Sequence, residues 1–438
     1  MSMDACRTMC AVAALLPALI LAPALTVLAP SAHAQAVRTQ SPPLPLPRPG
    51  TPGHTRDRKG RNEPPPIAAV PPPQLPPRAA FTAAEDAAAV VPGIPEARFW
   101  ADSVAEFTNA LPSKPGPWLV LSSGGEDGAF GAGLLNGLNA SGKRPEYSVV
   151  TGVSAGSLIA PFAFAGSAYD DALRDAFTKI TAADIFELGA TPESFVDTWP
   201  LKQLLTKEVT PALLADIAAQ HRAGRRLFII TTNLDAQRSV IWNMGAIAAH
   251  GGDEALNLFR GVLLASSSVP GAFPPVLIDV EANGKHFAEM HVDGGVGGQF
   301  FVAPAALMSA MSDYRLPATQ LYIVVNSGLE PSFEVVPQST PSILAQSVGM
   351  AVQVDTRFMV DRAFMLAKRS NVGFNVASIP PTFNTPSRGP FDPDYMKALF
   401  QTGYDLGNSA TPFSAEPPRY SGSSAPQSVD PEKAGATR

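Results

Sequence analysis

Short apolar runs alternate with stretches of helical spacing through the middle of the chain. The runs WLVLSS, YSVVTGV, RLFIITTNL and QLYIVVNS occupy residues 118–123, 147–153, 226–234 and 320–327. A strand buried on both sides is apolar at nearly every position, and parallel strands are joined by helices that cover both faces of their sheet. The pattern therefore predicts an α/β fold, with a mostly parallel central sheet between two layers of helices in a single domain.

Two further segments break this alternation. Residues 274–295 contain two strand-like runs on either side of Asn283-Gly284, a pair that favours the tight turn of a β-hairpin. Residues 343–369 have the spacing of one long helix, and we expect its large apolar side chains to lie in the core. Those side chains are Phe358, Met359, Phe364 and Met365.

The N-terminal residues 1–34 have the features of a signal peptide. Arg7 gives a positive start, a long apolar run follows, and Ala32 and Ala34 fit a cleavage site before Gln35. We therefore expect an exported protein that is periplasmic, envelope-associated or secreted. Because the apolar run is longer than many signal cores, an uncleaved N-terminal membrane anchor is the alternative.

Composition then divides the rest of the chain. Residues 35–89 are rich in proline and predict an extended, disordered tether, whereas residues 90–411 have the patterning of a folded domain. Residues 412–438 are rich in Ser, Pro, Gly and Ala and predict a disordered tail. Cys6 and Cys10 lie in the signal segment, so cleavage leaves no thiol for a disulfide or a zinc site. The net charge of −6 gives no basic surface for nucleic acid.

A serine between two glycines follows the second predicted strand. Gly152, Ser154 and Gly156 form the pattern G-x-S-x-G, with a strand before it and a helix-compatible run after it. This is the context of a nucleophile elbow, a sharp turn that exposes the serine at the start of a helix. The alternative is a serine that only caps the helix.

A glycine-rich loop, SGGEDGAFGAG, follows the first predicted strand. The dinucleotide fingerprint fails because Asn136 stands in place of its third glycine, and no Gly-Lys-Ser/Thr follows to form a phosphate loop. We therefore interpret the backbone amides of Gly124 and Gly125 as donors of an oxyanion hole. A turn that only lets the next helix pack closely on the sheet is the alternative.

The base that would activate Ser154 has candidates on the predicted hairpin. Four of the six histidines lie in the signal peptide, the tether or polar, helix-like surroundings: His33, His54, His221 and His250. His286 and His291 remain, and a triad with His291 would make the protein an α/β-hydrolase esterase. Asp293 is the other candidate, because it ends a strand and enters a glycine-rich turn. An aspartate that only bonds its own turn is the alternative.

Taken in order, these motifs resemble those of the patatin-like phospholipase family. SGGEDGAFGAGLLNGL resembles its glycine-rich oxyanion loop, GVSAGSL its nucleophile elbow and HVDGG its Asp-Gly motif. The segment LASSSVPGAFPPV at 264–276 is also similar, and the resemblance extends from about Trp118 to Val325. It implies a three-layer patatin-like fold and hydrolysis of lipid esters, of the phospholipase A, lipase or esterase type.

The resemblance also assigns roles to residues. Ser154 would be the nucleophile and Asp293 the base of a Ser-Asp dyad that needs no metal and no cofactor. The motif glycines are Gly152 and Gly156 in the elbow, Gly124, Gly125 and Gly128 in the oxyanion loop, and Gly294 and Gly295 after the aspartate. The implied partners are a lipid ester and, transiently, a membrane surface. A non-catalytic exported protein that binds lipid with the same fold is the alternative.

Two features bear on the substrate. The family loop usually has a glycine and a basic residue where this chain has Ser123 and Asp127. Because a carboxylate beside an oxyanion is unfavourable, we expect Asp127 to face outward. The segment 183–205 has large apolar side chains between turn signals, namely Phe186, Phe195, Trp199 and Leu201. They could form a flap over the site, but core packing of helices is the interpretation that we favour.

Overall fold

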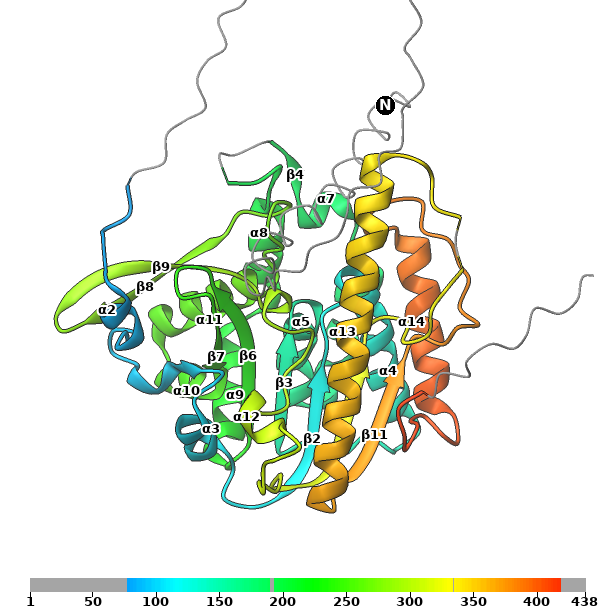
Figure 1. Ribbon diagram of the computed structural model, residues 1–438, viewed down its shortest axis with the longest axis horizontal. Helices are drawn as coiled ribbons and strands as arrows, with labels where there is room; N and C mark the ends of the chain where they lie inside the picture. The colour runs from blue at the N-terminus through cyan, green and yellow to red at the C-terminus, as the bar shows by residue number, and fades with distance from the viewer. Residues whose placement is uncertain (1–76, 190–192, 334, 419–438) are drawn as a thin grey trace, which may run out of the picture.

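The computed structural model describes residues 77–189, 193–333 and 335–418 (Figure 1). The expected signal peptide, most of the expected tether and most of the expected tail lie outside these ranges. Within them, no helix is long and apolar enough to span a membrane. The same ranges contain no group of three or more His, Cys, Asp or Glu side chains that could hold a metal ion.

The central sheet has nine strands and a parallel middle. Its order is β1-β7-β6-β3-β2-β10-β11, and the β8–β9 hairpin joins β6 through β9. The pairs from β6 through β3, β2 and β10 to β11 are parallel, and the pairs that involve β1, β7, β8 or β9 are antiparallel. The strands are β1 Arg98–Trp100, β2 Gly116–Leu121, β3 Val149–Val153, β6 Arg226–Asn233, β7 Arg238–Asn243, β8 Val276–Ala282, β9 Lys285–Asp293, β10 Ala318–Val325 and β11 Gly373–Ser378. The predicted mostly parallel sheet is confirmed.

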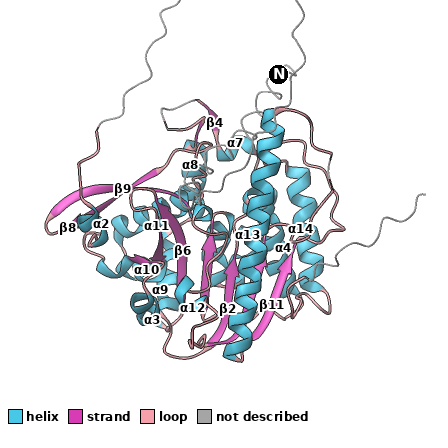
Figure 2. Cartoon of the chain, viewed as in Figure 1, coloured by secondary structure: helices cyan, strands magenta, loops and turns pink. Residues whose placement is uncertain are grey.

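Helices cover both faces of this sheet. One layer contains α4 Gly128–Ala140, α5 Ala155–Ala165, α6 Asp170–Thr178, α9 Pro211–Arg222, α10 Met244–His250, α11 Gly252–Ser266 and α14 Pro393–Asn408. The other contains α3 Val104–Ala110, α12 Ala305–Met308 and α13 Thr340–Ser370, which crosses in front of the sheet in Figure 2. Smaller elements at the periphery are α2 Ala83–Ala87, α7 Ala182–Ile185, α8 Trp199–Glu208, and the pair β4 Glu187–Leu188 and β5 Val196–Asp197.

The two layers bury opposite sides of every central strand. In β2, Leu119 and Leu121 lie in the core shared with α4 and α5, whereas Trp118 and Val120 lie in the core shared with α13. Successive side chains of a strand point to opposite faces of the sheet, so a strand covered on both faces must be apolar throughout. This explains why the central strands appear in the sequence as continuous apolar runs.

The predicted hairpin is confirmed at Asn283-Gly284. Their φ angles are 53° and 78°, as the tight turn between two twisted strands requires. The register of the hairpin pairs Val276 with His291, and the end of β9 then pairs antiparallel with β6. The hairpin thereby carries Asp293 to the edge of the sheet where the parallel strands end.

The folded region is longer at both ends than the sequence predicts. Phe81 stacks on Phe287 of the hairpin with ring centres 4.4 Å apart, and α2 follows it. At the other end, Ser414 and Val376 exchange two backbone hydrogen bonds of 2.9 Å. Residues 81–89, which the sequence places in the tether, and 412–414, which it places in the tail, therefore belong to the folded domain, because both segments find partners on it.

The long helix forms as predicted, but half of its expected core side chains do not lie in the core. Phe358 is 64% exposed and Met365 is 59% exposed, whereas Met359 and Phe364 are half-buried against the sheet. Residues seven apart lie on the same side of a helix. Phe358 and Met365 therefore share the outward side of α13, and their assignment to the core is wrong.

Candidate active site

Ser154 stands at the turn between β3 and α5, where a strained backbone presents it at the start of the helix. Its φ and ψ are 54° and −124°, a region that few residues other than glycine adopt. A Cβ on Gly152 would lie 2.4 Å from the carbonyl oxygen of Gly156, and one on Gly156 would lie 2.5 Å from that of Leu121. Only glycine fits at these two positions, so the strand–turn–helix geometry follows from the sequence pattern.

A second serine, which the sequence analysis missed, supports this turn. The Ser154 amide donates to Ser266 Oγ at 3.1 Å, and the Ser266 hydroxyl donates to the carbonyl oxygen of Ile230 at 2.7 Å. Ser266 is fully buried at the end of α11, and its two hydrogen bonds connect the turn at Ser154 to β6. Its one signal in the sequence is the SSS run at 266–268.

Asp293 ends β9, opposite Thr231 of β6, and is buried. Its Oδ1 accepts a hydrogen bond from the Gly295 amide at 2.7 Å, while its Oδ2 has no hydrogen-bond partner among the described residues. Burial raises the pKa of Asp293 to about 6, although the nearby Ser154 hydroxyl and the Gly295 amide both lower it. The structure thus brings the Ser154 hydroxyl beside the Asp293 carboxylate, whose Oδ2 is buried and unpaired among the described residues.

The glycine loop after β2 lies beside the Ser154 turn. It forms a 3₁₀ turn over Gly125–Asp127, and Gly125, whose φ is 58°, lines the same pocket as Ser154. In the described part of the chain, the amides of Gly124 and Gly125 find no hydrogen-bond acceptor. The Gly128 amide instead bonds within the turn, and a Cβ there would lie 2.6 Å from the Phe177 ring. Gly124 and Gly125 can therefore donate to an anion, whereas Gly128 serves close packing.

Gln299, also missed by the sequence analysis, joins this loop to the Asp-Gly turn. The Ser123 amide donates to the Gln299 carbonyl oxygen at 2.9 Å, and the Ser123 hydroxyl donates to the Gln299 side chain. Gln299 Nε2 then donates to the carbonyl oxygen of Gly295 at 3.0 Å. A Cβ on Gly294 would lie 2.4 Å from the Ile230 carbonyl oxygen, so the turn lies tightly on β6. Ser123 thus supports the loop from the position where the family usually has glycine.

Asp127, expected to face outward, is half-buried against α14. The Tyr395 hydroxyl donates to its Oδ1 at 2.5 Å, and burial raises the pKa of Asp127 to about 6. The neighbouring Glu126 accepts a hydrogen bond from the Phe391 amide. Asp127 does not line the pocket, but neither does it face solvent, because α14 supplies a partner that is 268 residues away in the chain. Asp127 and Glu126 thus connect the glycine loop by hydrogen bonds to α14 and to the residues just before it.

Of the two histidine candidates on the hairpin, neither forms a hydrogen bond with Ser154 in the described part of the chain. His291 is fully buried, and its Nδ1 and Nε2 lie 2.9 Å from Thr231 Oγ1 and 3.0 Å from Glu289 Oε2. Burial lowers the pKa of His291, which opposes the effect of the Glu289 carboxylate. His286 is exposed on the hairpin. His291 therefore belongs to a buried network beneath the hairpin, in which Glu289 also pairs with Arg98.

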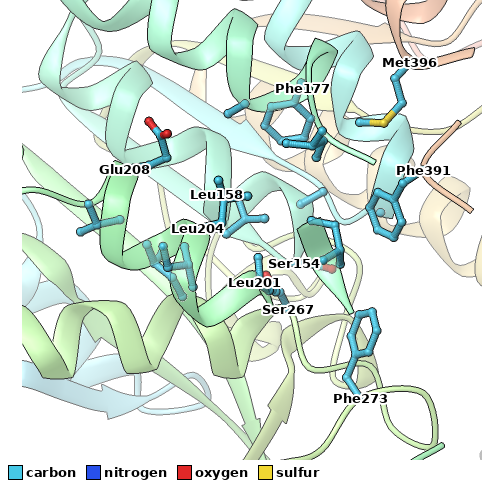
Figure 3. Close-up of a pocket in the computed structure, with 18 of the residues that line it drawn as sticks. Ser154, Leu158, Phe177, Leu201, Leu204, Glu208, Ser267, Phe273, Phe391 and Met396 are labelled. Atoms are coloured by element: carbon cyan, nitrogen blue, oxygen red, sulfur yellow. The ribbon is translucent and has the colours of Figure 1, made fainter. Parts of the chain in front are cut away.

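An apolar pocket opens at Ser154 (Figure 3). It encloses about 830 Å³ of free space, part of which is open to solvent. Its wall comes from α5, α6, α8 and the segments before β8 and α14, through side chains that include Leu158, Phe177, Leu201, Leu204, Phe273 and Phe391. A concave, mostly apolar pocket with a few polar groups is typical of a small-molecule site.

The segment 183–205 divides between core and surface. Phe186 packs on the main core, and Leu201 lines the pocket. Phe195 and Trp199 are 48% and 51% exposed, so the interpretation as core is wrong for both. In Figure 1, β4, α7 and α8 lie together at the end of the molecule toward which the β2 and β11 arrows point. The segment therefore presents one side to the pocket and the other to solvent.

A comparison with protein-family models agrees with these motifs. Residues 119–306, which include Ser154 and Asp293, match the model of the patatin-like phospholipase family. Among solved structures, VipD from Legionella pneumophila is similar over 68% of this chain and 66% of its own, just under two thirds, with 12% sequence identity and a TM-score of 0.34. A comparison with curated proteins finds no significant match. Residues 119–306 of this chain therefore form a patatin-like phospholipase domain.

Proposed function

We propose that the protein is a serine acyl hydrolase that cleaves ester bonds of lipids. The observation that carries the proposal is the buried carboxylate of Asp293 beside the Ser154 hydroxyl, which lines an apolar pocket. Proteins with a patatin-like domain are generally lipid acyl hydrolases. A carboxylate and a hydroxyl side by side are the groups that nucleophilic acyl transfer needs, and the pocket suits an acyl chain.

In the first step, Ser154 Oγ attacks the ester carbonyl carbon while Asp293 Oδ2 accepts the hydroxyl proton. The carbonyl oxygen becomes an oxyanion, which the amides of Gly124 and Gly125 stabilise. When the tetrahedral intermediate collapses, the bond to the alcohol oxygen breaks and Asp293 returns the proton to that oxygen. The alcohol leaves, and the acyl group stays as an ester of Ser154.

In the second step, water attacks the acyl carbon and gives a proton to Asp293. The new tetrahedral intermediate collapses, Ser154 Oγ leaves with the proton from Asp293, and the fatty acid is released. A carboxyl group with a pKa of about 6 is a stronger base than an ordinary aspartate and is still ionised at neutral pH. Burial of Asp293 therefore suits both steps.

We also propose that the protein is exported and meets its substrate at a membrane surface. The signal-like residues 1–34 support export. Beside the pocket, Phe195, Trp199 and the 70% exposed Leu188 support contact with lipid. Large apolar side chains that gather at one edge of a soluble domain mark interaction surfaces, and here that edge adjoins the place where an acyl chain would enter.

The experiment that tests the hydrolase combines substitution with active-site labelling. Ser154→Ala and Asp293→Asn should each abolish hydrolysis of a long-chain ester, and a fluorophosphonate should label the native protein but not Ser154→Ala. His291→Asn is the matched control, because a triad would lose activity in that variant instead. Full activity in either dyad variant would contradict the mechanism. Lipid binding without hydrolysis and without labelling would favour a non-catalytic binding protein.

A further inference from the structure

One charged side chain interrupts the apolar wall of the pocket. Among the described lining residues, Glu208 alone carries a charge, and the others are apolar side chains, glycine or serine. Its side chain is 25% exposed, and its Oε1 lies 2.8 Å from Lys207 Nζ. In Figure 3, Glu208 and Ser154 lie on opposite sides of the pocket, with Leu158 and Leu204 between them. The carboxylate therefore stands at the end of the pocket away from the nucleophile.

The pocket follows one face of α8 for two turns. Four residues of this helix line it at positions i, i+3, i+4 and i+7, namely Leu201, Leu204, Leu205 and Glu208. At a rise of 1.5 Å per residue, the stretch from Leu201 to Glu208 is about 10 Å long. On α5, the lining residues from Ala155 to Phe162 span the same number of residues. Both helices thus give the same length for the apolar channel that starts at Ser154.

We propose that Glu208 sets the longest acyl chain that this pocket accepts, an inference that rests on the proposed hydrolase function. An extended alkyl chain advances about 3.8 Å for every three bonds, so about 10 Å holds roughly eight bonds. An acyl chain attached at Ser154 would therefore reach Glu208 at about nine carbons. The structure thus points to medium-chain esters as the preferred substrates.

The Glu208 carboxylate should make kcat/KM change sharply with acyl length once the chain reaches it. Each methylene that enters the apolar channel should raise kcat/KM by about fourfold, as expected for the burial of one methylene. A methylene beyond about the ninth carbon would instead press on Glu208 and displace the water that solvates its charge, which is unfavourable. The gain per methylene should therefore stop at the length where the chain meets Glu208.

The test measures kcat/KM on p-nitrophenyl esters with acyl chains of four to sixteen carbons, all presented in the same neutral detergent micelles. In the native protein, kcat/KM should rise with chain length and stop rising near nine carbons. Glu208→Leu should raise the ratio of kcat/KM for fourteen carbons to that for eight by tenfold or more, because an apolar end wall no longer opposes the longer chain. Glu208→Gln keeps the size of the side chain and should move the ratio in the same direction.

Gln203→Leu is the matched control, because Gln203 is exposed on the outer side of the same helix and the substitution adds the same apolar side chain. The ratio should not change in this variant. An unchanged ratio in both Glu208 variants would overturn the inference, and so would an equal rise in Gln203→Leu. If the native protein hydrolyses no ester of any length and resists fluorophosphonate, the proposed function itself fails.

Discussion

The raised pKa of Asp293 makes the pH dependence of the reaction the most direct test of the proposed base. An ordinary aspartate, with a pKa of about 3.9, is still about 93% ionised at pH 5. With a pKa of about 6, Asp293 is ionised in only about 9% of molecules at pH 5. Only the ionised form can accept the Ser154 proton, so kcat/KM should fall by about tenfold from pH 8 to pH 5. A base with an ordinary pKa would lose less than about a tenth of its activity over the same range.

The assay is kcat/KM for a soluble short-chain ester between pH 4.5 and 8.5, because this quantity reports ionisations of the free enzyme. Circular dichroism at each pH separates loss of activity from loss of fold. Asp127 also has a pKa of about 6, so Asp127→Asn is the control that assigns the break. The break should persist in this variant, since asparagine can still accept the Tyr395 hydrogen bond. A flat profile down to pH 5, or a break that disappears in Asp127→Asn, would refute the reasoning.

Three further predictions follow, two on the residues that support the turn at Ser154 and one on the exposed apolar surface beside the pocket. Gly156→Ala should abolish both hydrolysis and fluorophosphonate labelling, because the new Cβ would lie 2.5 Å from the Leu121 carbonyl oxygen and disrupt the turn at Ser154. Ser266→Ala should leave the buried Ser154 amide without an acceptor and lower the free energy of unfolding by about 1–3 kcal/mol, measured by urea denaturation; an unchanged midpoint would contradict this. Trp199→Ala should reduce hydrolysis of esters in vesicles several-fold more than hydrolysis of a soluble ester, and equal effects on both would count against a lipid-facing surface.

The parts of the fold that the sequence predicts are those whose signals are local. A strand covered on both faces needs a continuous apolar run, so β2, β3, β6 and β10 are visible in the sequence. The hairpin turn needs two residues with positive φ, and Asn283-Gly284 supplies them. The turn at Ser154 also has a local signal in the sequence, because only glycine fits beside the close backbone at positions 152 and 156.

The parts that the sequence could not reveal depend on partners far along the chain. Ser266 supports Ser154 across 112 residues, and Tyr395 holds Asp127 across 268. A hydrogen bond of this kind leaves no spacing pattern, because either partner could stand at any position that the fold brings near. α13 shows a related limit, since its apolar residues give its helical spacing but not which of its sides faces the sheet. The expected core position of Phe358 is wrong for that reason.

The same burial that makes Asp293 a better base should also make the native protein less stable. Because its pKa is about 6 in the folded state and near 3.9 in the unfolded state, folding favours the protonated form, and stability should fall as pH rises from about 4 to about 6. The two pKa units amount to about 3 kcal/mol of destabilisation, all of it present at pH 8. Asparagine carries no charge, so Asp293→Asn should be inactive yet more stable than the native protein by up to about 3 kcal/mol at pH 8, and by little near pH 4. Urea unfolding at both pH values measures the difference. Equal stabilities at pH 8 would mean that the carboxylate is not held ionised in a buried site, and the argument for Asp293 as a strengthened base would fail.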